Sequence, residues 1–411
     1  MLSLSRKVIE GSTCMANILD YIDWRGDVPL PMDGFNEVDG LILAELSFID
    51  FSLLGISSEK EYGVTLHDAS RAYTELCADS AMDLGVLVPK RIPDLLEQAA
   101  NSVRFGSMRV TDYESVLDER REEQFAAICV EIEDNSVFCA FRGTDDTLVG
   151  WKEDLNMGVL DVIPAQKRAV AYLNRIAQKY PNASLLVGGH SKGGNLAVYS
   201  SVYTDEIVQS RITKVYNYDG PGFKRSISDA LGYDRISDRI LTVMPQSSVV
   251  GLILEHEDAT VFVRSDAVSI GQHDGFSWQV RGRAFEHVDD LSKEGKRTEE
   301  TLSAWTESLN DQERQSFVNA LYEVMRSTGA HTLSDLSDDG LKSLAGMIRT
   351  YRDLDDESQR ALSGAVDYLM RANARSFVQE LRESQEKGVE ALRLKVEETL
   401  QPKDSRQGKR H

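Results

Sequence analysis

This sequence has few cysteines, no long apolar run and a deficit of positive charge. The 411 residues include four cysteines, with no Cys-x-x-Cys spacing and no histidines at metal-ligand spacing, which argues against a zinc site and fits a reducing compartment. The longest apolar runs fall far short of the roughly 18 residues that span a bilayer, and none near the N-terminus resembles a signal peptide. We therefore expect a cytoplasmic protein with no integral membrane segment.

The excess of acidic over basic residues argues against nucleic-acid partners. Lys and Arg total 46 against 67 Asp and Glu, which gives a formal net charge of −21. A surface of this sign repels phosphate backbones, so we expect no nucleic acid among the partners. The length predicts two or three domains, or one large domain with additions.

The sequence pattern changes near residue 124. Two β-rich runs, 126–133 and 137–141, meet at Asp134-Asn135, a pair that tolerates positive φ, and this predicts a hairpin. Helical and strand patterns then alternate. Helices are expected at 165–180 and 195–202, and strands at 184–188, 214–218, 240–244 and 260–264. Alternation of this kind is typical of an α/β fold with a mostly parallel sheet flanked by helices.

The flanking regions have a different pattern. Residues up to about 115 mix polar turns with short helices, which predicts a partly helical cover. After residue 289 the strand patterns stop and helical patterns continue, one of them entered through Asn310 and Glu313 in capping-box spacing. We therefore divide the chain into an α/β domain over 1–289 and a helical C-terminal region over 290–411.

One sequence motif indicates a catalytic site. Gly189-His190-Ser191-Lys192-Gly193 follows an apolar strand and precedes a helix, as in the nucleophile elbow of α/β-hydrolases. In such a turn the serine adopts strained backbone angles, its flanking positions admit only glycine, and the helix N-terminus favours a developing oxyanion. We interpret Ser191 as a nucleophile. The alternative is a glycine-rich turn with a serine of no catalytic role.

An oxyanion hole needs two donors. The amide of Lys192, directly after the serine, is one candidate. Phe141-Arg142-Gly143-Thr144 ends a predicted strand, and the amide of Thr144 is the second candidate. Alternatively, Gly143 only turns the chain. Trp151 and Asp154 follow, and we expect them to brace this loop rather than react.

The order Phe-Arg-Gly-Thr, Trp, Asp and then Gly-His-Ser-x-Gly resembles the class 3 lipases. The closer resemblance is to the Mbeg1-like proteins, a bacterial family related to those lipases, and it spans roughly residues 16–329. Its features stand here at 17–21, 35–39, 188–197, 219–222 and 272–276. The resemblance implies an α/β-hydrolase fold and lipase or esterase activity on a small-molecule or lipid acyl ester, but it supplies no substrate.

The remaining triad members follow the chain order serine, acid, histidine. His273 lies in a loop after the last strands and matches the histidine of the related lipases; a surface histidine is the alternative. Class 3 lipases place an aspartate after a strand that corresponds to 240–244, yet 240–248 contain no carboxylate. Asp219, at the end of the preceding strand, is our candidate acid, and a turn-forming Asp-Gly is the alternative.

These residues predict a serine hydrolase that cleaves a carboxylic ester through an acyl-enzyme on Ser191, with neither metal nor organic cofactor. Thioesterase, amidase or acyltransferase chemistry on the same site is an open alternative. So is a catalytically idle hydrolase fold used for protein interaction. In either case the C-terminal helices could serve in self-association.

Overall fold

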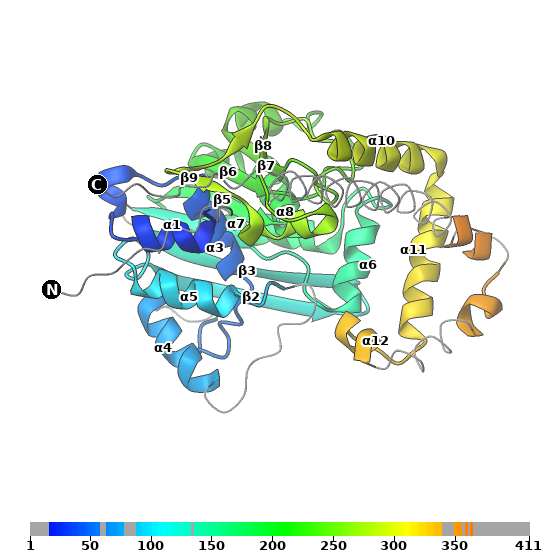
Figure 1. Ribbon diagram of the computed structural model, residues 1–411, viewed down its shortest axis with the longest axis horizontal. Coiled ribbons are helices and arrows are strands. Elements are labelled where there is room, and N and C mark those ends of the chain that lie inside the picture. The colour runs from blue at the N-terminus through cyan, green and yellow to red at the C-terminus, as the bar shows by residue number, and fades with distance from the viewer. Residues whose placement is uncertain are drawn as a thin grey trace, which may run out of the picture. The chain divides into compact units, whose positions relative to one another are not determined.

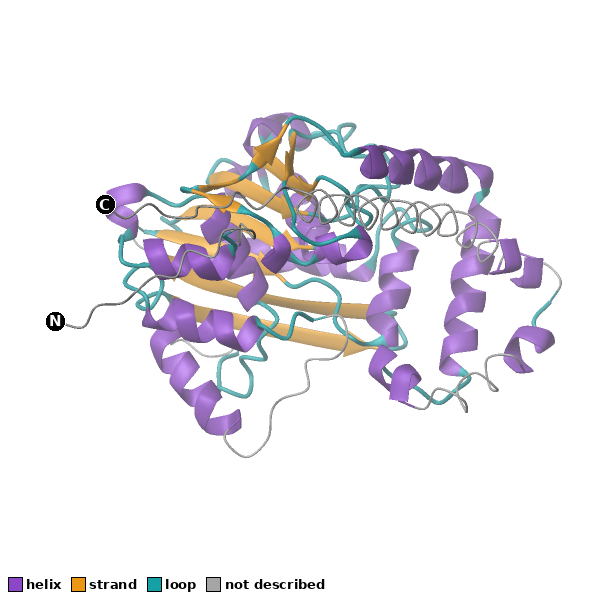
Figure 2. Cartoon of the chain, viewed as in Figure 1, coloured by secondary structure: helices purple, strands orange, loops and turns teal. Residues whose placement is uncertain are grey.

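The computed structural model describes residues 16–57, 63–77, 88–132, 135–338, 349–355, 358–360 and 362–364. It divides into two compact units, Met1–Leu354 and Asp355–His411. The first unit contains the sheet, the helices around it and the C-terminal helices up to α12 (Figures 1 and 2). The helices predicted beyond residue 340 fall largely outside the described residues.

A mixed sheet runs through the first unit. Its strand order is β1-β2-β3-β4-β5-β6-β7-β8-β11. The strands are β1 (Val64–Thr65), β2 (Arg109–Asp118), β3 (Glu123–Ile132), β4 (Ser136–Phe141), β5 (Ser184–His190), β6 (Ile212–Tyr218), β7 (Ile240–Pro245), β8 (Thr260–Val263) and β11 (His287–Val288). The pairings from β4 to β8 are parallel and those at both edges are antiparallel. A separate pair joins β9 (Val280–Arg281) to β10 (Ala284–Phe285).

Helices surround this sheet. They are α1 (Ile18–Arg25), α2 (Leu30–Asp33), α3 (Glu37–Leu46), α4 (Leu66–Cys77), α5 (Ile92–Asn101), α6 (Leu148–Asn156), α7 (Pro164–Lys179), α8 (Lys192–Tyr203), α9 (Glu206–Gln209), α10 (Lys293–Ser308), α11 (Asp311–Arg326) and α12 (Leu333–Asp338), with short 3₁₀ turns η1 (Tyr233–Arg235), η2 (Ser237–Arg239), η3 (Ser269–His273) and η4 (Gly275–Ser277). The predicted α/β class is therefore confirmed, with the parallel strands at the centre of the sheet.

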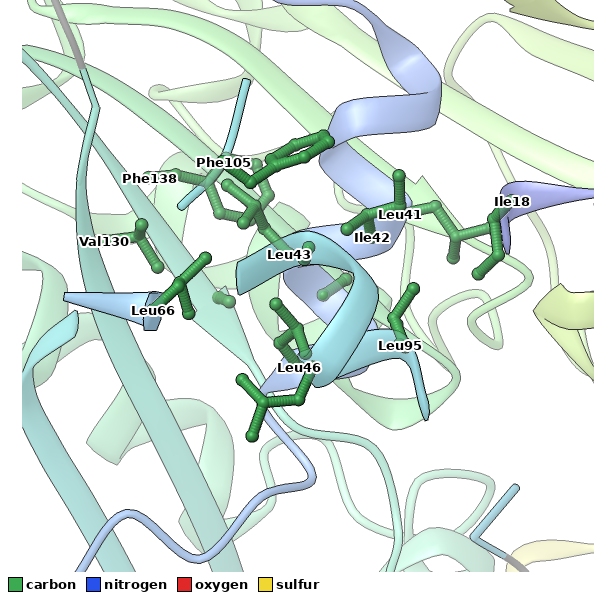
Figure 3. Close-up of a cluster of buried hydrophobic side chains, with 14 of the residues drawn as sticks. Ile18, Leu41, Ile42, Leu43, Leu46, Leu66, Leu95, Phe105, Val130 and Phe138 are labelled. Atoms are coloured by element: carbon green, nitrogen blue, oxygen red, sulfur yellow. The ribbon is translucent and has the colours of Figure 1, made fainter. Parts of the chain in front are cut away.

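The two faces of the sheet pack against different helices. Ala126, Ile128 and Val130 of β3 join the core under α1, α3, α4 and α5 (Figure 3). The intervening residues Ala127 and Cys129 join the core under α7 and α8. This alternation follows from the two-residue period of a strand, so β3 is buried on both faces.

The predicted hairpin is confirmed. β3 and β4 pair antiparallel with Cys129 opposite Cys139, and Asn135 in the connection has a φ of 57°. Asparagine tolerates this left-handed conformation better than most residues, which explains its place in the turn. The predicted capping box of α11 is also present, since Asn310 and Glu313 bond each other's backbone amides.

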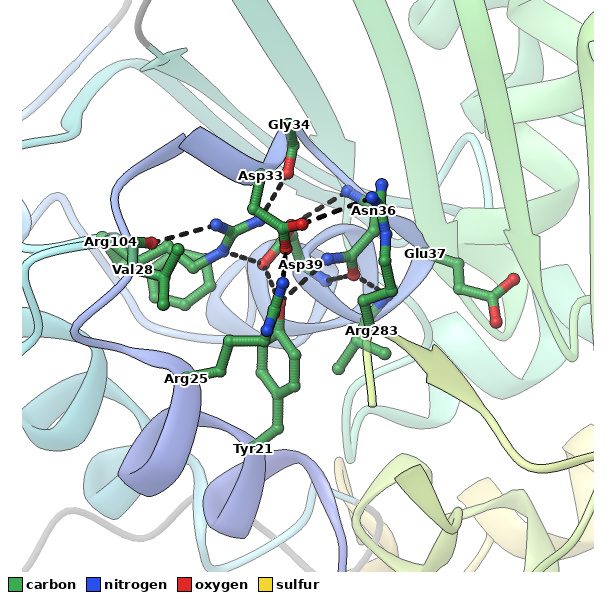
Figure 4. A network of polar contacts seen from close by, with 12 residues as sticks. Tyr21, Arg25, Val28, Asp33, Gly34, Asn36, Glu37, Asp39, Arg104 and Arg283 are labelled. Carbon is green, nitrogen blue, oxygen red and sulfur yellow. Dashed lines mark hydrogen bonds and ion pairs between the residues drawn. The ribbon is translucent and has the colours of Figure 1, made fainter. Parts of the chain in front are cut away.

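A buried polar network fixes the start of α3 (Figure 4). Arg104 forms a fully buried ion pair with Asp39 and donates to the carbonyl oxygen of Gly34 at 2.6 Å. The Tyr21 hydroxyl donates to Asp39 Oδ1 at 2.9 Å, and Asn36 caps the helix. Removing one member would leave an uncompensated buried group, so the network holds α3 in one position.

Within the first unit, the segment after the last strand packs against α6. The amide of Leu148 in α6 donates to the carbonyl oxygen of His331, and the Lys152 ammonium lies 4.5 Å from the centre of the Tyr322 ring in α11. Strand β11 ends at Val288 and α10 begins at Lys293, on either side of the predicted boundary. The division into domains at residue 289 stays a prediction.

Candidate active site

Ser191 stands between β5 and α8 in a strained backbone conformation. Its φ is 58° and its ψ is −132°, in a region that residues with a side chain rarely occupy. Its amide donates to the carbonyl oxygen of Tyr218 in β6 at 2.9 Å. Strain of this kind persists only where the surroundings impose it, and it is typical of a functional turn.

The glycines on either side of Ser191 are required by close backbone contacts. A Cβ on Gly189 would lie 2.3 Å from the carbonyl carbon of Gly193. A Cβ on Gly193 would lie 2.0 Å from the carbonyl oxygen of Phe141. Real Cβ atoms do not approach backbone atoms so closely, so the Gly-x-Ser-x-Gly spacing is a packing requirement of this turn.

The loop after β4 lies against the serine. A Cβ on Gly143 would be 3.1 Å from Ser191 Cβ and 2.8 Å from the carbonyl oxygen of His190. Gly143 therefore does more than turn the chain, because its lack of a side chain lets the loop approach the elbow. The next residue, Thr144, is buried, and its hydroxyl donates to Asp154 in α6. Asp154 thus braces the loop, as expected from the sequence.

Lys192 begins α8, so its amide belongs to the first turn, which has no acceptor within the helix. Its side chain is buried. The ammonium donates to the carbonyl oxygen of Gln124 at 3.0 Å and to Glu153 Oε2 at 3.2 Å. Because these contacts commit the ammonium to a buried network, the amide is what Lys192 can offer an oxyanion.

His273 and Asp219 are in direct contact. The distance from His273 Nδ1 to Asp219 Oδ2 is 2.7 Å. Asp219 follows β6, is fully buried, and donates its amide to the carbonyl oxygen of Val243 in β7. His273 ends η3, and its side chain is 22% exposed. A carboxylate on Nδ1 leaves Nε2 as the nitrogen that can exchange a proton with a substrate or nucleophile.

The second oxygen of Asp219 also has a partner. Ser248 Oγ donates to Asp219 Oδ1 and accepts from the amide of Gly251 at 3.0 Å. Ser248 is fully buried and follows β7, the strand after which class 3 lipases carry their acid. Sequence reasoning noted the missing carboxylate in this stretch and overlooked the serine, for which the sequence carries no specific signal.

The histidine loop is anchored at Gln272, the residue before His273. Gln272 Oε1 accepts from the amide of Ser247 at 3.0 Å, and Trp278 Nε1 donates to the carbonyl oxygen of Gln272 at 2.8 Å. Both contacts are buried, so they fix the backbone immediately before His273.

A cavity of about 630 Å³ lies beside Ser191 and His273. Ser191, Lys192, His273 and Thr144 contribute to its lining. Further apolar lining comes from the loop after β7 and from the segment containing α10 and α11, through Val250, Ile253, Leu254, Leu302, Leu309, Phe317 and Val318. The C-terminal helices are therefore part of the cavity wall, and a small polar area meets a larger apolar one, as in pockets for small organic ligands.

The sequence pattern of the Mbeg1-like proteins matches residues 99–323, more than half of the chain. The chain belongs to the Mbeg1-like family. No curated protein matches it.

Among solved structures this Mbeg1-like chain is similar to a variant of MDLA from Penicillium cyclopium, at 13% identity over 62% of this chain and 87% of that chain, with a TM-score of 0.36. It is also similar to lipase II from Rhizopus niveus, at 11% identity over 61% and 85%, with a TM-score of 0.36. A third is the native Rhizomucor miehei lipase propeptide complex, at 16% identity over 52% and 74%, with a TM-score of 0.31.

Three asparagines in the segments singled out from the sequence have structural roles. Asn195 in α8 accepts from Gln166 Nε2 and donates to the carbonyl oxygens of Pro221 and Gly222. These contacts tie the elbow helix to the loop that begins with Asp219. Asn17 caps α1, as Asn36 caps α3.

Burial shifts the protonation of two groups near the site. Desolvation raises the pKa of Asp154 to about 6, against the opposing effects of the Lys192 ammonium and the Thr144 hydroxyl. Burial lowers the pKa of His256 below its usual range, and its Nε2 lies 2.8 Å from the carbonyl oxygen of Gly251. His256 is thus placed as a structural histidine.

In the part of the chain that the structure describes, no group of three or more His, Cys, Asp or Glu residues is placed to hold a metal ion. Across the same residues, each helix is too short or too polar to cross a bilayer.

Proposed function

We propose that this Mbeg1-like protein is a serine hydrolase that cleaves a carboxylic ester through an acyl-enzyme on Ser191. The observation that carries the proposal is the contact of His273 with the buried Asp219 on the cavity that Ser191 also lines. A strained nucleophile, an imidazole and a buried carboxylate are the parts that acyl transfer requires.

In the proposed reaction, His273 Nε2 takes the proton of the Ser191 hydroxyl while Ser191 Oγ attacks the ester carbonyl carbon. The amides of Thr144 and Lys192 donate to the oxyanion that forms, each contributing on the order of 3 kcal/mol. The imidazolium then gives its proton to the leaving alcohol as the C–O bond breaks. Water, deprotonated by His273, releases the acid and regenerates Ser191.

The buried carboxylate has a supporting role in these steps. Asp219 holds His273 in the tautomer with hydrogen on Nδ1 and stabilises the imidazolium. Ser248 occupies the other oxygen of Asp219, which limits rotation of the carboxylate. The apolar wall of the cavity suits the acyl part of the ester.

A fluorophosphonate probe tests the proposal, because it reacts with an activated serine. We expect labelling of the wild type and of Ser210→Ala, an exposed-serine control, and no labelling of Ser191→Ala. His273→Ala should label at least about 10³-fold more slowly. Absence of labelling in folded wild-type protein would favour an idle hydrolase fold instead.

A further inference from the structure

Glu45 is a buried acidic residue next to His190 that the proposed mechanism does not use. Glu45 belongs to α3, whose residues from Val38 to Leu46 are all buried. Its side chain is fully buried, and among the described residues neither of its oxygens has a hydrogen-bond partner that meets normal geometry. Glu45 Oε1 lies 3.4 Å from Nδ1 of His190.

His190 connects Glu45 to His273. Its other ring nitrogen, Nε2, lies 2.8 Å from the carbonyl oxygen of His273. The two imidazole rings also stack, with centroids 4.6 Å apart and planes 30° from parallel. His190 is 4% exposed, so the contacts are shielded from water. One side chain therefore touches both the backbone and the ring plane of His273.

The surroundings decide the protonation of this pair. Burial raises the pKa of Glu45 well above its usual range, and the charge of Asp274 acts in the same direction. Burial lowers the pKa of His190 well below its usual range. Both shifts favour the neutral form of the group. A carbonyl oxygen only accepts, so His190 carries its hydrogen on Nε2, and Nδ1 is left as an acceptor that the carboxylic acid of Glu45 faces.

Packing alone gives no reason for an acid at this position. Burying a polar group that lacks good hydrogen bonds costs free energy, and the neighbours of Glu45 on α3 are apolar. The helix itself is held in place by the buried network of Asp39 and Arg104 (Figure 4). Glu45 therefore contacts His190 from a helix whose position is fixed.

We propose that Glu45 is a positioning residue for His273 and acts through His190. Its carboxyl group lies against Nδ1 of His190 and holds that ring where Nε2–H meets the carbonyl oxygen of His273 and the two ring planes face each other. The proposal rests on the proposed function for its effect on catalysis. The contact itself does not depend on turnover.

Three variants test it with p-nitrophenyl butyrate and thermal unfolding. Glu45→Gln keeps a neutral donor, so we expect kcat within about twofold of wild type. Glu45→Leu removes the donor, and we expect kcat to fall by about tenfold or more at a KM within about twofold, since small misplacements of a catalytic group are costly. The apolar side chain should leave Tm equal or higher.

Ile42→Val on the same helix is the matched control. It leaves a small cavity in the same core and should lower Tm with kcat unchanged. A wild-type kcat in Glu45→Leu would overturn the proposal. So would an equal loss of kcat in Glu45→Gln and Glu45→Leu, because a neutral donor would then not suffice.

A second readout needs no activity. In ¹⁵N–¹H spectra of the imidazole groups, wild type and Glu45→Gln should show neutral His190 with its proton on Nε2, and Glu45→Leu should shift the signals of His190 and His273. A proton on Nδ1 of His190 in the wild type would overturn the proposal. If the wild type neither hydrolyses esters nor labels while these spectra are as expected, the hydrolase function fails and the positioning contact stands.

Discussion

His273 Nδ1 lies 2.7 Å from Asp219 Oδ2, and the carboxylate that it contacts follows β6 rather than β7. β6 and β7 are adjacent parallel strands, so their carboxyl ends meet at the same edge of the sheet. An acid on either strand can therefore face a histidine that enters from the loop beyond β8. The position after β7 is taken by Ser248, which bonds the same carboxylate.

Replacing Asp219 should slow the chemical step and leave substrate binding nearly unchanged. We expect Asp219→Asn to lower kcat by about 10³–10⁴-fold with little change in KM, because the amide no longer fixes the tautomer or stabilises the imidazolium. Hydrolysis of p-nitrophenyl butyrate measures both parameters. Asp234→Asn, an exposed change near the same loop, is the control. Retention of more than a tenth of wild-type kcat would remove Asp219 from the mechanism.

The wall formed by α11 should influence the preferred acyl length. Phe317 is buried and lines the cavity, so Phe317→Ala should enlarge the space for the acyl chain. We expect the ratio of kcat/KM for octanoate over butyrate esters to rise by about tenfold, the effect of one or two methylenes in an apolar pocket. Exposed Asn319→Ala on the same helix should leave the ratio unchanged, and an unchanged ratio in Phe317→Ala would place the acyl chain elsewhere.

Asp154 should make stability depend on pH. Its pKa in the folded protein, about 6, lies above the ordinary value of 3.8. The folded state therefore binds a proton more tightly than the unfolded chain. Asp154 therefore adds to the free energy of unfolding, measured as wild type minus Asp154→Asn. This contribution is fully present below about pH 4 and is lost as pH rises through 6.

Chemical denaturation of both proteins at several pH values between 4 and 8 measures this difference in the free energy of unfolding. Asp238→Asn controls for the loss of one exposed charge. A difference that stays constant across the range, or that grows with rising pH, would contradict a raised pKa at Asp154.

The elbow glycines should not tolerate alanine. Gly193→Ala would place its Cβ 2.0 Å from the carbonyl oxygen of Phe141, so strands and loop would have to shift. We expect a loss of about 3 kcal/mol or more in the free energy of unfolding. Gly158→Ala, whose Cβ would meet its nearest atom at 3.6 Å, should change stability by less than about 0.5 kcal/mol. Comparable thermal unfolding of the two variants would argue against the tight turn.

The sequence by itself determined the features that depend on neighbouring residues. Two β-rich runs joined by a turn pair predicted the hairpin of β3 and β4, because strand propensity and turn chemistry are local. The two glycines around Ser191 predicted the tight turn, because close backbone approach excludes a Cβ. Chain order, loop position and the family resemblance together predicted His273 and Asp219 as candidates.

Only the tertiary structure decided which distant groups meet. Glu45 and His190 are 145 positions apart, and nothing in the apolar stretch around Glu45 indicates which buried partner its carboxyl group will face. The same holds for Ser248 with Asp219, and for Phe317 of α11 in the wall of the cavity. Such contacts are set by how whole layers pack. Hydrophobic patterning specifies which face of an element is buried, and it leaves open what lies opposite.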